Sequence, residues 1–397
     1  MKIDKEIPRI WTKDFVIIII ANFFIFTSFQ MTLPTLPLYV QEITASDTWV
    51  GLIVGIFTFS ALLIRPFGGH ILDKSGRAPV FLTGLLILVV SLYSLAASTT
   101  ILILVIVRVV QGLGWGLSNT ASGTIASDLV PRERRGEGLG YFGLSGNLAL
   151  AVGPALGLFL VDHIRFSSLF LICGSLTLLA LLLALTIKYK KVEPETKMSQ
   201  ENKVVEKPRM QVVEKRALPA STLLFFITFT FGGIATFLPA YSFEQGFPSY
   251  AIQLYFVIYA VSLVTTRLFA GRIFDRRGLA IVFIPGTILI IIGLVLLALL
   301  KSQAFLYFGA MFYGLGFGTI QPALQASAIN TTPPEKRGMA NATFFSSFDL
   351  GVGLGAMTFG LVSQYIDYAS IYWISATSAS LALVLYFILR MSNKFAS

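Results

Sequence analysis

Residues 65–77 read RPFGGHILDKSGR, and residues 267–279 read RLFAGRIFDRRGL, a near-copy of the first stretch. The same offset of 202 residues joins other pairs of identical residues: Leu36 with Leu238, Pro37 with Pro239, Tyr39 with Tyr241, Pro131 with Pro333, and Gly136 with Gly338. A single offset that holds along the chain without slippage indicates an internal duplication. We therefore predict two structurally equivalent halves.

Long apolar runs occupy most of the 397-residue chain. Apolar residues make up 55% of it and charged residues only 13%, about half the ~25% of an ordinary soluble protein. Each run has about 20 residues or more, the length that crosses ~30 Å of hydrocarbon. A lone segment in lipid must satisfy its own backbone hydrogen bonds, so these runs are predicted to be helices. The twelve predicted spans are 14–40, 48–72, 79–98, 100–126, 138–163, 167–188, 218–243, 249–273, 279–300, 304–329, 338–363 and 369–390.

This composition excludes a soluble enzyme, a disordered chain and a secreted disulfide scaffold. The chain has one cysteine, which cannot form an intramolecular disulfide, and two histidines, too few for a His/Cys metal site. The predicted fold class is an all-α polytopic membrane protein, with twelve transmembrane helices in two pseudo-symmetric six-helix bundles. We place the bundles at residues 1–187 and 218–397. Residues 188–217 are rich in charge and poor in large apolar side chains, which predicts a flexible cytoplasmic linker.

The basic residues mark one side of the membrane. The formal net charge is +10, and 25 of the 30 Lys and Arg residues fall in the termini and in the loops on their side. The opposite loops hold only Arg165 and Lys301. This asymmetry is the positive-inside signature. We therefore expect a multi-pass protein of the cell membrane with both termini in the cytoplasm, and no nucleic acid as a partner.

The loop after the second span carries a distinctive set of residues. Its pattern Gly69-x-x-x-Asp73-x-x-Gly76-Arg77 resembles the signature loop of the major facilitator superfamily. The resemblance implies that the loop aspartate latches the two halves on the cytoplasmic side. It also implies that the loop arginine pairs with an acidic residue at the end of the fourth span, here Asp128. The expected gate residues are Gly69, Asp73, Gly76, Arg77, Asp128 and the repeat-related Asp275.

The second half supports the pairing of Arg77 with Asp128. At the offset of 202 residues, Arg77 becomes Leu279 and Asp128 becomes Asn330, so both charges are lost together. The alternative interpretation of this loop is a solvated turn that only keeps its charges inside.

Two further motifs resemble those of proton-coupled members of the same superfamily. The fourth span has Arg108-x-x-Gln111-Gly112, as in a motif frequent in proton-coupled transporters. The fifth span has Gly153-Pro154-x-x-Gly157, which is similar to the antiporter motif of drug/proton exporters. Ala149 and Leu158 stand where the antiporter motif prefers glycine. We assign Gly112, Gly153, Pro154 and Gly157 to helix packing.

Three arginines lie inside predicted spans, where a charge costs roughly 2.5–3.5 kcal/mol unless it is paired or hydrated. Arg65 and Arg267 are repeat-related and near the cytoplasmic end, which favours snorkelling and structural pairing. Arg108 differs because its counterpart is Ala310, so the fold alone does not require a charge there. We predict a role for Arg108 in proton coupling or substrate binding, with a structural ion pair as the alternative.

Asp349 is the acidic residue that lies well inside a predicted span, and its counterpart is Asn147. Burial favours the protonated form of a carboxylic acid, so Asp349 is the second candidate for proton coupling. The alternative is a permanent ion pair with Arg65, because the resemblance implies that spans two and eleven are neighbours. The first span offers Asn22 and Gln30 where many drug/proton antiporters carry an acid, so a known coupling scheme does not transfer residue by residue.

Polar and aromatic stripes indicate a solute-binding surface. Residues four apart share one helix face, and such stripes occur in the fourth and tenth spans. The resemblance implies that spans one, four, seven and ten line a central cavity. An aromatic and amide lining suits an amphiphilic organic solute; aromatic packing between helices is the alternative. The candidate binding residues are Asn22, Gln30, Gln111, Trp115, Asn119, Phe229, Tyr313, Phe317, Gln321 and Gln325.

The predicted function is secondary active transport. Its leading form is export of small organic or amphiphilic solutes in exchange for protons, by alternating exposure of a central site. A proton symporter or uniporter that imports a sugar, carboxylate or amino acid is the alternative, and a non-transporting receptor or assembly factor is a further one. No phosphate-binding loop, nucleophile elbow or zinc motif indicates an enzyme. We expect no cofactor, a proton gradient as the driving force, and a monomer in the lipid bilayer.

Overall fold

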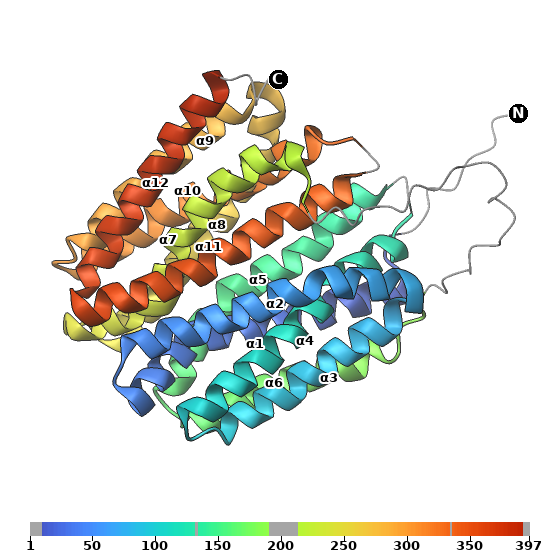
Figure 1. Ribbon diagram of the computed structural model, residues 1–397, viewed down its shortest axis with the longest axis horizontal. Coiled ribbons are helices and arrows are strands. Elements are labelled where there is room, and N and C mark those ends of the chain that lie inside the picture. The colour runs from blue at the N-terminus through green and yellow to red at the C-terminus, as the bar shows by residue number, and fades with distance from the viewer. Residues whose placement is uncertain (1–9, 132–133, 190–212, 334–335, 392–397) are drawn as a thin grey trace, which may run out of the picture.

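The computed structural model describes residues 10–131, 134–189, 213–333 and 336–391. These residues form twelve long α-helices, six in each half, and no strand. The first half contains α1 (Lys13–Thr44), α2 (Asp47–Ser75), α3 (Arg77–Ala96), α4 (Ile101–Leu129), α5 (Arg135–Val161) and α6 (Phe166–Ala184). The second half contains α7 (Leu218–Glu244), α8 (Ser249–Arg277), α9 (Leu279–Ala298), α10 (Gln303–Asn330), α11 (Arg337–Tyr365) and α12 (Tyr368–Met391). Figure 1 shows the halves side by side, with α7–α12 at the upper left.

The predicted fold class is confirmed. Eleven of the twelve described helices are long and apolar enough to cross a membrane. The exception is α10, whose sequence intersperses glycine and glutamine among its aromatic residues. Most of the predicted linker lies outside the described residues, so the boundaries given above for the two bundles stay a prediction.

Residues that are 202 positions apart in the sequence occupy equivalent places in the structures of the two halves. The second helix of each half begins at the equivalent residue, α2 at Asp47 and α8 at Ser249. The turn before α3 has Gly76 at φ 95°, and the turn before α9 has Gly278 at φ 77°. Such positive φ angles favour glycine, which has no Cβ. The duplication of the sequence is therefore a duplication of structure, down to the conformation of a turn.

Glycines set the closest approaches of helices within each bundle. A Cβ added at Gly112 on α4 would meet the backbone of α2, and one added at Gly314, its counterpart on α10, would meet the backbone of α8. Gly153 and Gly157 bring α5 against α1 in the same way, with Pro154 beside them inside α5. Small residues at such contacts let two helix backbones approach within the membrane.

Two seams join the halves. α2 packs against α11, and α5 packs against α8, while α1 and α7 make a smaller contact between them. α11 is the repeat counterpart of α5, and α8 is the counterpart of α2. The α2–α11 seam and the α5–α8 seam are therefore related by the pseudo-symmetry of the chain, and differences between them come from side chains.

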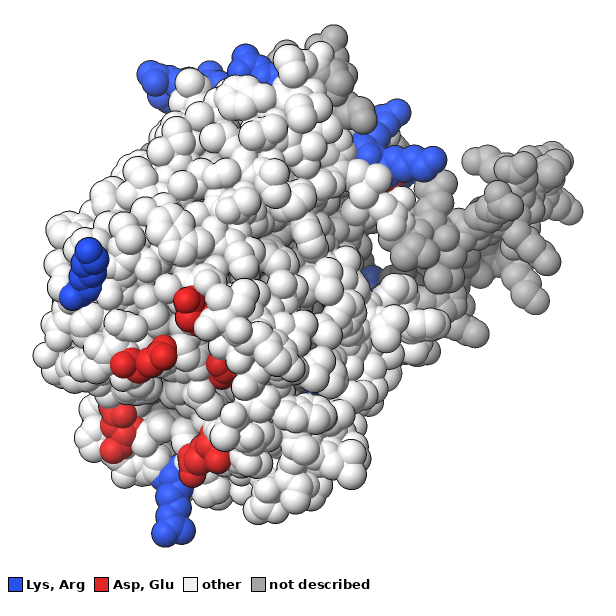
Figure 2. Space-filling view, turned by 60° about the vertical axis from the view of Figure 1, so that its left-hand side comes forward, with Lys and Arg blue, Asp and Glu red and all other residues white. Residues whose placement is uncertain are grey.

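Charged side chains separate between two faces of the molecule. Successive helices alternate in direction, so the start of α1 and the end of α12 share one face, here called the termini face. Figure 2 shows acidic side chains gathered on the opposite face, at the lower left, and basic side chains along the upper edge. The opposite face carries Glu42, Asp47, Asp162, Glu244 and Asp367, with the basic residues Arg165 and Lys301.

Candidate functional site

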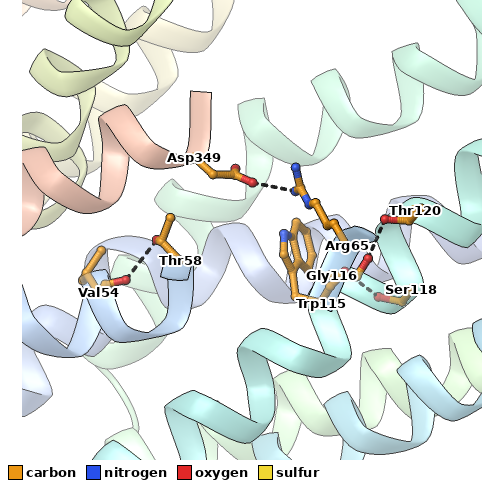
Figure 3. Close-up of polar contacts among 8 residues, drawn as sticks. All are labelled: Val54, Thr58, Arg65, Trp115, Gly116, Ser118, Thr120 and Asp349. Atoms are coloured by element: carbon orange, nitrogen blue, oxygen red, sulfur yellow. Dashed lines mark hydrogen bonds and ion pairs between the residues drawn. The ribbon is translucent and has the colours of Figure 1, made fainter. Parts of the chain in front are cut away.

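An ion pair crosses the α2–α11 seam. Nη2 of Arg65 on α2 lies 2.7 Å from Oδ2 of Asp349 on α11, and each side chain is less than one-fifth exposed. Figure 3 shows the Arg65 side chain extending towards Asp349, with Trp115 of α4 beneath it. The two charges neutralise each other, which lets both lie within the membrane. The ion pair given above as the alternative for Asp349 is thus present in this conformation.

The equivalent position of the α5–α8 seam holds amides instead of a carboxylate. Arg267 on α8 is the counterpart of Arg65, and its Nη1 and Nη2 donate hydrogen bonds to Asn147 Oδ1 on α5 and Gln321 Oε1 on α10. Asn147 stands where α11 has Asp349. Within the described ranges, no carboxylate pairs with Arg267. The second seam therefore carries a positive charge that its neutral partners do not balance.

Arg108 lies inside the first bundle. Its side chain is buried, its Nη1 donates to Gln111 Oε1 at 2.7 Å, and its Nε donates to the backbone oxygen of Ile53 at 3.3 Å. Its guanidinium carbon lies 4.2 Å from the ring centroid of Phe57. These partners of Arg108 belong to α2 and α4, and none of them to α11. The structure thus does not bring Arg108 and Asp349 together.

The polar and aromatic stripe of α4 faces the interior of the first bundle. The Trp115 ring stacks on Phe29 of α1, with centroids 4.2 Å apart. Trp115 and Gln111 line a small cavity with residues from α1, α2, α3 and α6. Asn119, one turn further, is half-buried. This stripe packs helices of one bundle in the present conformation.

The two candidate binding residues of α1 are also buried. Asn22 Nδ2 donates to Ser145 Oγ on α5 at 2.8 Å. Gln30 packs directly against Gly153 of α5. Both residues therefore contribute to the contact between α1 and α5.

The stripe of α10 divides between packing and the seam. Tyr313 has its hydroxyl 2.8 Å from a threonine of α7, and its ring stacks on Phe317. Gln321 reaches the arginine of the α5–α8 seam, while Gln325 donates to an asparagine of α11. Phe229 lines a pocket between α7 and α12. In this conformation the predicted binding residues are spread over both bundle interiors, the α5–α8 seam and this pocket.

A second ion pair stabilises the termini face. Arg77 Nε, at the start of α3, lies 2.9 Å from Asp128 Oδ2, near the end of α4. Arg77 Nη1 also donates to the backbone oxygen of Leu72 at 3.1 Å, which ties the α2–α3 turn to the pair. The remaining predicted gate residues, Gly69, Asp73 and Asp275, lie outside the residues whose side-chain environment is described.

A hydrogen-bond network closes the α2–α11 seam at the opposite face. The Tyr368 hydroxyl donates to Asp47 Oδ1 at 3.0 Å and accepts from Gln41 Nε2 at 2.8 Å. Gln41 also donates to Asp47, and the Asp47 backbone N–H donates to Gln364 Oε1 on α11. At the other seam, Gln253 of α8 donates to an aspartate that follows α5. The conformation is therefore closed at the opposite face.

The sequence reasoning missed both the opposite-face network and the amide partners of Arg267. The offset of 202 residues could have indicated the contact of Arg267 with Asn147, because it maps the pair Arg65 and Asp349 onto these two residues. Gln321 and the opposite-face network carry no such signal.

We expect Tyr368→Phe to loosen the opposite-face network, because it removes one donor and one acceptor but keeps the ring. The population open at that face should rise about fivefold, as expected from roughly 1 kcal/mol for a hydrogen bond. Spin labels at His163 and Lys301, which are exposed and belong to different halves, report opening as a longer distance. Tyr365→Phe is the control, because Tyr365 is 79% exposed. Equal changes in both variants would remove this role from Tyr368.

The fold and its seams define a class of protein. Two pseudo-symmetric six-helix bundles, with half-buried charged side chains where the bundles meet, form the architecture of a secondary transporter. A sequence model of the Major Facilitator Superfamily matches residues 18–328 and, in a second match, residues 251–395. The chain belongs to this superfamily and is a multi-pass membrane transporter.

Its relatives include exporters. The chain is 28% identical over 381 residues to the uncharacterised MFS-type transporter YhhS of Escherichia coli K12, covering 93% of this chain and 90% of YhhS. It is 26% identical to the multi-drug resistance efflux pump PmrA homolog of Lactococcus lactis, covering 90% of both chains. It is 22% identical to the staphylopine export protein of Staphylococcus aureus, covering 91% of this chain and 92% of that one.

Solved transporters share the fold at low sequence identity. The D323A mutant of the nucleoside transporter NupG superposes with a TM-score of 0.77 at 16% identity, covering 94% of this chain and 98% of that one. A D-xylose-proton symporter superposes with a TM-score of 0.75 at 17% identity, covering 94% and 97%. These similarities establish the architecture of the chain.

Proposed function

We propose that the chain exports small organic solutes in exchange for protons, with both termini in the cytoplasm. The observation that carries the proposal is the ion pair of Arg65 with Asp349, because it places a half-buried carboxylate between two halves that must move apart during transport. Export is supported by the relatives described as an efflux pump and an export protein. The acidic opposite face and the basic loops support the orientation.

Protonation of Asp349 would neutralise one partner of this pair. The attraction to Arg65 then weakens, so α2 and α11 separate more easily, and loss of the proton restores the attraction. Asp349 therefore holds its proton more tightly in the conformation with the seam parted. Such a difference in affinity between two conformations is what couples a ligand to a conformational change. The proton gradient drives the cycle, and no cofactor is required.

Proton-driven import is the second candidate. The specific observation in its favour is the departure of α5 from the antiporter motif at Ala149 and Leu158, together with the absence of an acidic residue in α1 between Phe15 and Gln41. The two candidates use the same ion pair and differ in whether proton and solute cross in opposite directions or together.

Inverted membrane vesicles from a pump-deficient bacterium test the direction of coupling. Respiration acidifies the vesicle lumen, and an acridine dye reports the pH difference through quenching of its fluorescence. We expect addition of a transported compound to release protons and restore fluorescence, in vesicles that contain the chain and not in empty-vector vesicles. If a broad panel of compounds gives no release, and right-side-out vesicles instead accumulate a nutrient together with protons, import replaces export.

A further inference from the structure

The two seams differ by one charge at equivalent positions. Arg65 has the carboxylate of Asp349 across its seam, whereas Arg267 has the amides of Asn147 and Gln321. Both arginines sit ten residues before the end of their helix, at the same depth. Both an arginine–aspartate pair and an arginine–amide pair are compatible with the helix packing, because the backbones of the two seams are related by the pseudo-symmetry. The positive charge of Arg267 is therefore available to an anion that the described residues do not supply.

The chemistry of this cluster fits a carboxylate. A guanidinium offers planar pairs of N–H donors that match the two oxygens of a carboxylate. Each amide side chain presents an oxygen that accepts from Arg267 when the cluster is empty, and an NH₂ group that can donate to an anion after a simple rotation. With an anion bound, all three side chains can serve as donors. An aspartate in place of Asn147 would instead repel the anion and occupy the arginine.

The cluster also joins both halves of the transporter. Asn147 belongs to the first bundle, whereas Arg267 and Gln321 belong to the second. A ligand held by all three contacts is bound more tightly when the seam has one arrangement than when it has the other. Solute binding at this position would therefore shift the balance between conformations, as alternating access requires.

We propose that Arg267, Asn147 and Gln321 bind the carboxylate group of the transported solute, so that the chain prefers organic anions or zwitterions to neutral compounds. The proposal rests on the transport function proposed above and deepens it by naming the substrate class. The two seams then have different roles: Asp349 in the α2–α11 seam binds the proton, and Arg267 in the α5–α8 seam binds the charged group of the solute.

Binding to the purified full-length protein in nanodiscs of neutral lipid tests this assignment. The probes are small aromatic and aliphatic carboxylates, each paired with the neutral amide of the same skeleton, and binding is measured as the rise in Tm. We expect some carboxylates to raise Tm where their amides do not. Asn147→Asp should weaken carboxylate binding roughly tenfold or more, as loss of a charge-assisted contact predicts. Equal effects of acid and amide throughout the panel would overturn the proposal.

Two further variants separate loss of binding from loss of folding. Asn147→Asp gives Arg267 the partner that Arg65 already has, so its Tm without ligand should equal or exceed that of the unmodified chain. Asn147→Gln keeps a neutral amide and should keep the preference for carboxylates. If Asn147→Asp does not fold, Arg267→Gln takes its place and should lose the preference. If Asn147→Asp or Arg267→Gln still prefers carboxylates to their amides, the carboxylate binds at another site and the proposal is overturned.

An anionic lipid headgroup is the other source of a negative charge. Nanodiscs with phosphatidylglycerol added to the neutral lipid distinguish it from a solute, since we expect carboxylate binding to persist there. Complete displacement by the lipid would overturn the solute assignment. The vesicle assay keeps the two proposals apart: proton release by neutral or cationic compounds alone supports export and overturns the anion site. Carboxylate binding without proton release supports the anion site and overturns proton-coupled export.

Discussion

Asp349→Asn should abolish proton-driven uphill transport in proteoliposomes while solute exchange in the absence of a pH gradient continues in part. An amide can neither release nor take up a proton, so the change of conformation is no longer tied to the gradient. We expect gradient-driven accumulation to fall to the level of proteoliposomes without the protein. The α5–α8 seam, where Arg267 already faces an amide, shows that the fold accommodates such a pair.

The measurement uses a compound identified in the vesicle assay, with uptake followed under an imposed pH gradient and as exchange without one. Asp367→Asn is the matched control, because Asp367 is an exposed acidic residue between α11 and α12. It should leave both kinds of flux unchanged. Full uphill transport by Asp349→Asn would exclude Asp349 as the proton carrier and leave the ion pair a structural role.

Arg77→Ala should lower both stability and transport, because it leaves the half-buried carboxylate of Asp128 without its partner. Loss of a charge-assisted hydrogen bond of this kind costs roughly 1.5–3 kcal/mol, reduced here by partial exposure to solvent. The turn at Gly76 also loses the bond from Arg77 to Leu72. A lower Tm of the purified protein, and slower compound-dependent proton release in vesicles, are the expected readouts.

The second half of the chain supplies the control for this pair. It has Leu279 and Asn330 at the equivalent positions, so Arg77→Leu combined with Asp128→Asn copies an arrangement that the fold already contains. The double variant should regain a large part of the Tm that either single substitution loses, since the two side chains act as a unit. Additive losses in the double variant would show that the two charges act independently.

Much of the architecture could be predicted from the sequence because its signals are local. The runs of apolar residues set the number of helices, and the offset of 202 residues set their equivalence. Even the conformation at Gly76 and Gly278 follows from short-range chemistry, since glycine tolerates a positive φ. The composition of α10 weakened the same signal, because glycine and glutamine lower the hydropathy of a helix without preventing it from forming.

The candidate site was only partly predictable. The ion pair of Arg65 with Asp349 could be anticipated, because a buried charge in lipid needs a partner and few candidates exist. The stripes of α4 and α10 follow from the spacing of four residues, yet this periodicity cannot say what a helix face contacts. Trp115 and Tyr313 meet neighbours within their own bundles, and Gln321 meets the α5–α8 seam.

The sequence by itself determined that this chain is a duplicated twelve-helix membrane protein and which of its charges break the duplication. Only the tertiary structure decided that Arg65 meets a carboxylate across one seam and that, among the described residues, Arg267 meets amides across the other. Arg267 and Asn147 are 120 residues apart and lie on different helices. The pattern of apolar residues in either helix does not specify the other helix as its neighbour. A contact of that kind depends on how two finished bundles meet, and the hydrophobic periodicity of single helices does not contain that information.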